Sequence, residues 1–302
     1  MPTTSEVDEP GRASARPGSS GHRAWDSSIG NWRALLLVSP LVVLLALFVF
    51  YPLVKLGIDS VTAGEGVRNY STALESPAVR RALITTMVAG VVITVLSVGI
   101  GALLAWYLRT VQSPVALALL WLAVLAPFWL GTVVKNYAII LLFSRNGALN
   151  DLLGLVGVGP LSILYKPGAV IFGTTYTMIP YAVFSLYAVF LSIDLALVAA
   201  ARSMGASRTR ALSTVVLPLA LPGFVASTAL VFAITIGFYV TPVLLGGAQT
   251  PFMASVIQDN VLNYFNYPLA SAASVMLLVA ALAILGLALR LVGRERLVRA
   301  VA

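Results

Sequence analysis

The strongest constraint on this chain is a series of apolar runs, each about as long as a membrane-spanning helix. Six runs contain no Asp, Glu, Lys or Arg: residues 34–54, 82–108, 115–134, 169–193, 221–244 and 269–289. A helix rises about 1.5 Å per residue, so about 20 residues cross the roughly 30 Å hydrocarbon core of a bilayer. Apolar residues make up 59% of the chain and charged residues only 10%, which does not fit a water-soluble fold. These runs predict an all-α, polytopic membrane protein with six transmembrane helices.

The same composition excludes several kinds of chemistry. The chain has no cysteine, and its only histidine, His22, lies in a polar stretch, so thiolate metal sites and intramembrane histidine chemistry are excluded. No Asp or Glu lies within a predicted span, which leaves no candidate proton relay. No Gly-x-x-x-x-Gly-Lys-Ser/Thr motif is present, so any ATP must bind to a separate subunit. A stand-alone secondary transporter, or a membrane enzyme using Ser/Lys or carboxylate chemistry, remains an alternative function.

Polar segments divide the chain into three parts. Residues 1–32, rich in Pro, Gly and Ser, are predicted to be a disordered cytoplasmic tail. Residues 33–292 form the predicted transmembrane domain, and residues 293–302 a cytoplasmic C-terminal tail. The segments on the side of the two termini carry twelve of the 19 Lys and Arg residues. The positive-inside rule therefore places both termini in the cytoplasm, and the charge of +8 reflects orientation in the plasma membrane rather than nucleic-acid binding.

A basic loop, residues 194–218, separates the fourth and fifth predicted spans. Asp194 and Ser207 can each cap the start of a helix, because their side chains accept hydrogen bonds from free backbone N–H groups. Gly205 lies between them and suits a left-handed turn. The loop is therefore predicted to contain two short helices, over residues 195–204 and 208–216, the second ending near Pro218.

The first of these helices offers a small, smooth face to a partner. Ala200, Ala201 and Met204 are expected on one side of it, because positions three and four apart share a helix face. The arginines of the loop, Arg202 among them, have a second explanation: they can serve only to keep the loop on the cytoplasmic side. Physical reasoning from the residues leaves both explanations open.

The loop resembles the signature loop of permease subunits of binding-protein-dependent ABC importers. That pattern is Glu-Ala-Ala, three residues, Gly, nine residues, Ile, one residue and Leu-Pro. The residues of this chain that match are Ala200, Ala201, Gly205, Val215, Leu217 and Pro218. Ala199 stands where the family has Glu, which puts in doubt any ion pair with the ATPase at that position. The resemblance implies that a coupling site, seated on the ATPase, comprises Ala199, Ala200, Ala201, Arg202, Gly205, Leu217 and Pro218.

Further segments resemble the spermidine/putrescine-type permeases of this family. They are residues 127–129, 134–138, 144–147, 237–242, 244–247 and 266–268. The resemblance implies the ABC type I importer permease fold, a polyamine as the leading cargo, and another small solute as the alternative. It also implies three protein partners: an ATPase dimer that binds ATP and Mg²⁺, a second permease subunit and an extracytoplasmic solute-binding protein. This chain itself is expected to be no enzyme and to hold no cofactor or metal.

Aromatic and hydroxyl side chains inside the apolar runs are candidates for the cargo pathway. Tyr176, Tyr181, Thr235 and Tyr239 are the residues selected, because tyrosine rings can attract a cationic amine. The alternative is that such residues only pack helices together or form local hydrogen bonds. Lys135 has the same sign of charge as a polyamine, so we expect it to extend towards the outer interface instead of touching cargo.

Overall fold

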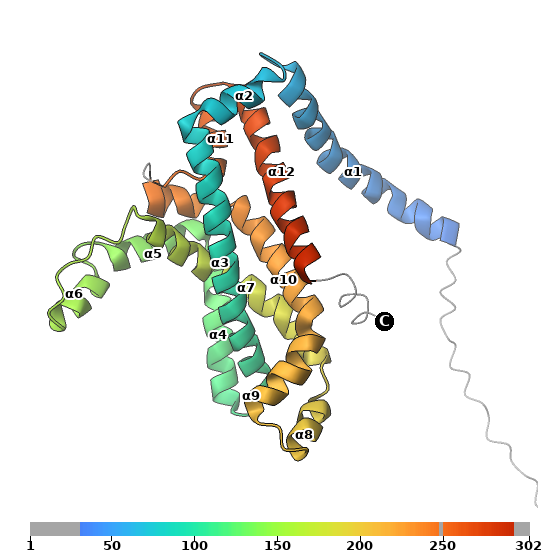
Figure 1. The fold of residues 1–302 in the computed structure, drawn as a ribbon, viewed down its shortest axis with the longest axis vertical. Coiled ribbons are helices and arrows are strands. Elements are labelled where there is room, and N and C mark those ends of the chain that lie inside the picture. The colour runs from blue at the N-terminus through green and yellow to red at the C-terminus, as the bar shows by residue number, and fades with distance from the viewer. Residues whose placement is uncertain (1–30, 248–249, 293–302) are drawn as a thin grey trace, which may run out of the picture. The chain divides into compact units, whose positions relative to one another are not determined.

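The computed structural model describes residues 31–247 and 250–292 (Figure 1). The predicted tails, residues 1–32 and 293–302, lie outside the described part except for positions 31 and 32. The chain divides after Pro52 into two units, residues 1–52 and 53–302, and each is described by itself. The site and its supporting helices all belong to the second unit.

Every element within the described residues is helical. In chain order they are α1 (Asn31–Thr62), α2 (Arg68–Glu75), α3 (Pro77–Thr110), α4 (Pro114–Trp129), α5 (Thr132–Phe143), α6 (Ala148–Leu155), α7 (Pro167–Ser192), α8 (Leu195–Ser203), α9 (Arg208–Ala211), η1 (Leu212–Val216), α10 (Leu217–Ile236), η2 (Pro242–Gly246), α11 (Met253–Leu262) and α12 (Tyr267–Val292). The two η elements are π-helical turns, in which backbone hydrogen bonds span five residues.

Six helical segments in the described part are long and apolar enough to cross a membrane. They are Val38–Thr62, Pro77–Thr110, Thr132–Leu155, Pro167–Ser192, Arg208–Ile236 and Tyr267–Arg290. The prediction of an all-α protein with six transmembrane helices is therefore confirmed, and two of the predicted boundaries need correction.

The third predicted span is not one continuous helix. Helix α4 ends at Trp129, where Leu130 is extended, and α5 begins afresh at Thr132. At 16 residues α4 is shorter than each of the six segments that are long enough to cross a membrane. The segment that meets the criteria of length and hydropathy is Thr132–Leu155, although a turn after Phe143 divides it into α5 and α6. The predicted third span, residues 115–134, is therefore wrong in its bounds, because its last residues belong to a separate helix.

The helix predicted to end near Pro218 instead runs on into the membrane. Elements α9, η1 and α10 form one helical segment of 29 residues, Arg208–Ile236. The Leu217 N–H bonds to the Leu212 carbonyl five residues back. This wider turn lies just ahead of Pro218, whose ring would crowd the preceding carbonyl of a regular helix. The segment then ends at Ile236, earlier than the predicted 244.

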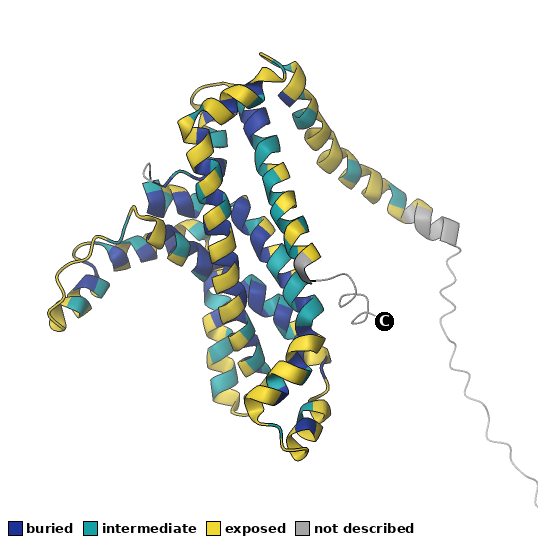
Figure 2. Ribbon diagram, viewed as in Figure 1, coloured by how far each residue is buried: buried dark blue, intermediate teal, exposed yellow. Residues whose placement is uncertain are grey.

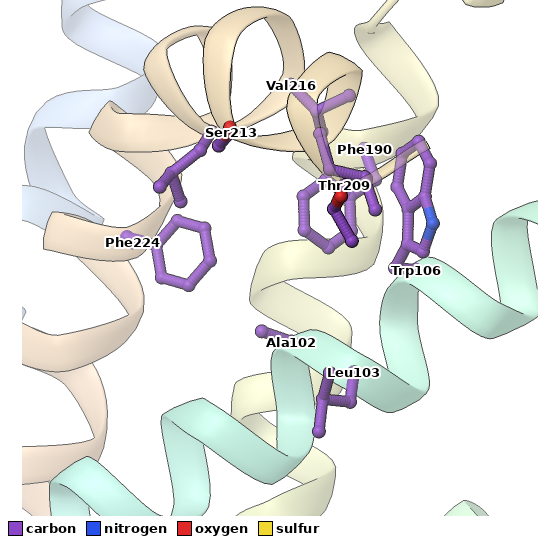
Figure 3. Close-up of a pocket in the computed structure, with 10 residues that line it drawn as sticks. Ala102, Leu103, Trp106, Phe190, Thr209, Ser213, Val216 and Phe224 are labelled. Carbon is purple, nitrogen blue, oxygen red and sulfur yellow. The ribbon is translucent and has the colours of Figure 1, made fainter. Parts of the chain in front are cut away.

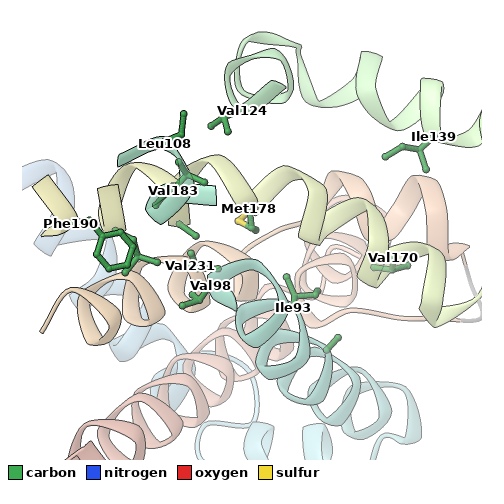
Figure 4. Close-up of a cluster of buried hydrophobic side chains, with 14 of the residues drawn as sticks. Ile93, Val98, Leu108, Val124, Ile139, Val170, Met178, Val183, Phe190 and Val231 are labelled. Atoms are coloured by element: carbon green, nitrogen blue, oxygen red, sulfur yellow. The ribbon is translucent and has the colours of Figure 1, made fainter. Parts of the chain in front are cut away.

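The core of the second unit lies where α3, α7 and α10 pack against one another. Figure 4 shows Ile93 and Val98 of α3 facing Met178 and Val183 of α7, with Val231 of α10 beside them. Helix α7 is the most buried of the long helices, and Figure 2 shows dark blue residues on α7 and α10. The three helices therefore form the rigid scaffold on which the loops at both ends are mounted.

A glycine allows a close approach of two helices within this scaffold. A Cβ atom added at Gly101 of α3 would lie 2.6 Å from the Cβ of Ala182 on α7. Both residues are completely or nearly completely buried. The absence of a side chain at Gly101 therefore sets the distance between the two helices that pack together most extensively.

Candidate functional site

The basic loop has the local structure that its sequence predicts. The Ala196 N–H donates to Asp194 Oδ1 at 2.8 Å, and the Arg210 N–H donates to Ser207 Oγ at 3.2 Å. Gly205, between the two helices, has φ +90°, in the region that favours glycine. The two capped helices α8 and α9 therefore meet at a glycine turn at one end of the unit (Figure 1).

The predicted partner-facing side of α8 needs one correction. Ala200 and Met204 are exposed, and Met204 is 84% exposed, but Ala201 is only 8% exposed. A step of about 100° per residue carries Ala201 past the edge of this face, toward the side on which α8 packs against η1 and α9. Leu197, 49% exposed, takes its place. We call the exposed stripe of Leu197, Ala200 and Met204 the outward ridge; Ala199 is also exposed.

The remaining residues of the predicted coupling site lie apart from the outward ridge. Arg202 lines a hollow between α8 and the end of α3. Leu217 and Pro218 are exposed in the first turn of α10, beyond η1. The family pattern thus spans two elements, α8 and the start of α10, and η1 joins them.

The four predicted pathway residues make contacts of different kinds. Thr235 of α10 is 1% exposed and donates its hydroxyl to the Val231 carbonyl at 2.7 Å, within its own helix. Tyr181 packs edge-on against Phe128, with ring centroids 5.7 Å apart. Tyr176 is partly buried and packs against the core. These contacts fit the alternative to a cargo role, in which such residues only pack helices together or form local hydrogen bonds.

Two hydroxyl groups on α7 differ from that of Thr235 on α10, because they have no hydrogen-bond partner among the described residues. Tyr239 is partly buried near the end of α10, where its carbonyl accepts the Val243 N–H at 3.2 Å. The hydroxyls of Thr174 and Thr175, by contrast, are buried without a hydrogen-bond partner among the described residues. Buried polar groups are normally paired, so these two threonines are better candidates for a functional contact than Thr235.

A buried pair that sequence reasoning did not connect joins α5 to η2. Asn136 Nδ2 donates to Thr241 Oγ1 at 2.9 Å, and Thr241 Oγ1 donates to Asn136 Oδ1 at 3.1 Å. Both residues are 0% exposed. They belong to two segments, 134–138 and 237–242, that carry the subfamily resemblance. The only feature of the sequence that could have linked Asn136 to Thr241 is that both lie in segments with this resemblance.

Lys135, beside this pair, is buried instead of extending to an interface. Its side chain is 6% exposed, and Nζ donates to the Pro127 carbonyl at 3.3 Å. That carbonyl lies in the last turn of α4, where backbone carbonyls lack helical partners. Lys135 therefore caps the end of α4, and the expectation that it reaches an interface is wrong.

Comparison with known proteins shows which sequences this chain resembles. No family model matches it. Spermidine/putrescine transport system permease protein PotB of Escherichia coli is 30% identical over 246 residues, covering 78% of this chain and 89% of PotB. PotB of Haemophilus influenzae is 31% identical over 215 residues, covering 70% and 74%. The sulfate transport system permease protein CysT of Salmonella typhimurium is 28% identical over 218 residues, covering 72% and 77%.

Solved structures share the fold. A chain of a bacterial alginate ABC transporter, in complex with an alginate pentasaccharide-bound periplasmic protein, has a TM-score of 0.73 at 19% identity, covering 91% of this chain and 98% of that chain. A chain of the MetNI methionine ABC transporter has a TM-score of 0.51 at 22% identity, covering 71% and 93%. The fold is that of a membrane permease subunit of an ABC importer. By its identity to PotB, this chain belongs to the ABC importer permeases of the spermidine/putrescine type.

Proposed function

We propose that the outward ridge of α8 is the surface on which an ATPase subunit docks. Ala200 and Met204 present a small, apolar, exposed face at the end of the unit, and Gly205 fixes the turn behind it. ATP and Mg²⁺ bind to the ATPase subunit in this proposal. With Ala199 in place of the family's Glu, the contact rests on shape and apolar burial instead of an ion pair at that position.

Movement of the docked ATPase is carried into the membrane through η1. Helix α8 packs against η1, which continues without interruption into α10, and α10 packs against α3 and α7. A displacement of α8 therefore reaches the scaffold through Leu217 and Pro218, in the first turn of α10. This continuity is the single observation that carries the proposal, since a loose surface loop could not transmit force.

The cargo in this proposal is a polyamine, and the chain forms half of a pore made with a second permease. The likeness to the two PotB proteins supports the cargo. A solute-binding protein delivers it from the side opposite the two termini, which are cytoplasmic by the distribution of Lys and Arg. The rings of Tyr176, Tyr181 and Tyr239 offer cation–π contacts. Thr174 and Thr175 offer hydroxyls that have no partner among the described residues. Another small solute is the alternative, since CysT is also a relative.

Co-purification from cells that express the whole transport operon tests the docking surface. Met204→Glu places a charge on the outward ridge, and Thr214→Glu places the same charge on an exposed site of η1, off the ridge. We expect Met204→Glu to release the ATPase while Thr214→Glu retains it, with equal amounts of both chains in the membrane. Failure of the ATPase to associate with the parent, or equal retention by both variants, contradicts the proposal.

Uptake into proteoliposomes containing the complete transporter tests the cargo. Radiolabelled spermidine and sulfate are compared in the presence of ATP inside and the cognate binding protein outside. We expect ATP-dependent spermidine uptake and no sulfate uptake. The reverse preference would assign the chain to the alternative cargo class.

A further inference from the structure

Two neighbouring hollows lie between the basic loop and the end of α3. The first has a volume of about 320 Å³ and an almost wholly apolar lining from α3, α7, η1 and α10. Figure 3 shows the rings of Trp106, Phe190 and Phe224 around this space, with Leu103 on the other side of it. Trp106 packs edge-on against Phe190, with ring centroids 5.5 Å apart. The aromatic side chains thus form a preformed apolar slot.

The second hollow is polar and basic. It has a volume of about 390 Å³, and Arg202 of α8 and Arg208 of α9 line it together with Thr110 and Gln112. Neither arginine forms an ion pair with a described residue. The carboxylate of Asp194, the acid nearest to them in sequence, is occupied in capping α8. Two unneutralised guanidinium groups beside neutral hydrogen-bonding groups make a site for an anion.

The two hollows share a wall. Trp106 and Leu212 line both of them, so an apolar slot continues directly into a basic one. A ligand that fills both must carry an anionic group at one end and a hydrocarbon chain at the other. Because this chain spans the membrane, an anionic phospholipid is the molecule with that chemistry that is present beside it. Trp106 and the adjacent exposed Tyr107 also suit the interfacial depth at which a headgroup lies.

We propose that this is a binding site for one anionic phospholipid. Its phosphate contacts Arg202 and Arg208, and one acyl chain occupies the slot between Trp106 and Phe224. Val198 and Arg202 line the hollow on one side of α8, whereas the outward ridge lies on another side of the same helix. The lipid and a docked protein can therefore bind α8 together. The bound lipid ties α8 to α3, so the position of the loop depends on the anionic lipid content of the membrane.

Quenching of tryptophan fluorescence by brominated lipids tests the site. The probe is the full-length chain with Trp25, Trp32, Trp121 and Trp129 replaced by Phe, so that only Trp106 emits. It is reconstituted in bilayers containing increasing fractions of phosphatidylglycerol or phosphatidylcholine, each with brominated acyl chains. We expect phosphatidylglycerol to reach half-maximal quenching at a mole fraction about tenfold lower than phosphatidylcholine, the order expected for two basic contacts.

Two matched pairs of variants locate the lipid. Arg202→Gln/Arg208→Gln should remove the preference for phosphatidylglycerol, whereas Arg210→Gln, an exposed arginine of α9 outside the hollow, should keep it. Ser213→Phe fills the apolar slot and should reduce quenching by phosphatidylglycerol. The control Thr214→Phe alters the next residue, which is exposed but does not line the slot.

Three results would overturn the proposal. The first is equal quenching of the parent by the two lipids, and the second is an unchanged preference in the double arginine variant. The third is loss of the preference when inorganic phosphate is added at millimolar concentration, which would assign the basic hollow to a soluble anion. If the double variant instead loses the ATPase in co-purification but keeps its lipid preference, the arginines serve the protein interface and the lipid assignment fails.

Discussion

The basic loop and the segment around α5 show two different ways in which polar side chains shape this permease. In the loop, each cap joins neighbours: Asp194 bonds to the N–H two residues on, and Ser207 to the N–H three residues on. Around α5, Asn136 bonds to Thr241, which is 105 residues away in sequence. The loop is therefore determined by local sequence, whereas the α5 segment depends on the assembled helices. Distant contacts should cost more to break than local ones.

The largest effect should come from the close contact between α3 and α7 at Gly101. Gly101→Leu inserts a side chain where even a Cβ meets Ala182 at 2.6 Å, so we expect a loss of about 3 kcal/mol or more in free energy of unfolding. Thermal unfolding of the purified protein in detergent measures it. Gly99→Leu is the matched control, because a Cβ at Gly99 meets nothing within 4 Å. Similar losses at the two positions would contradict the close approach of α3 and α7.

The buried pair at α5 should give the next largest effect. Asn136→Leu leaves the Thr241 hydroxyl buried without its partner, at a cost of about 2 kcal/mol. Asn136→Leu/Thr241→Val removes both polar groups and should recover part of that loss. Unfolding measurements on the two single variants and the double variant give the coupling energy. A coupling energy near zero would show that the two residues act independently.

A smaller loss is expected in the loop. Asp194→Ala removes the N-cap of α8 and should cost about 1 kcal/mol. Asp194→Asn keeps a capping oxygen and serves as the control. Because this cap is local, hydrogen exchange should rise in α8 alone, while exchange in α3 and α7 stays unchanged. Increased exchange in the scaffold would show that this cap also stabilises helices beyond α8.

The smallest change in stability should come from Thr235. Its hydroxyl bonds only to a carbonyl of its own helix, so Thr235→Val should change the free energy of unfolding by no more than about 0.5 kcal/mol. Spermidine uptake by the same variant separates the two interpretations of this residue. Unchanged uptake identifies Thr235 as a packing residue, and reduced uptake at unchanged stability restores it to the cargo pathway.

The sequence predicts what neighbouring residues determine. Apolar runs predict six spans, and Asp194, Gly205 and Ser207 predict the ends of α8 and α9, because a cap needs only residues close in sequence. The break between α4 and α5 is harder to foresee, since Lys135 stabilises it by reaching back to a carbonyl of the preceding helix.

Burial and pairing depend on helices that the chain brings together only on folding. Ala201 is buried because α8 packs on η1, a contact that helix periodicity alone does not reveal. The bond between Asn136 and Thr241 likewise requires α5 and η2 to be adjacent. The two helices of the basic loop could therefore be located from the sequence. Which of their residues are buried, and which contacts the predicted pathway residues make, could not.

The direction in which the basic loop points depends on the number of residues in the π-helical turn η1. One extra residue in a turn rotates everything before it by about 100° relative to a regular helix. Deleting Thr214, which lines neither hollow, would therefore swing Arg208 and Arg210 around the axis of α10. The π-helical turn therefore determines which side of the helix bundle the basic loop faces.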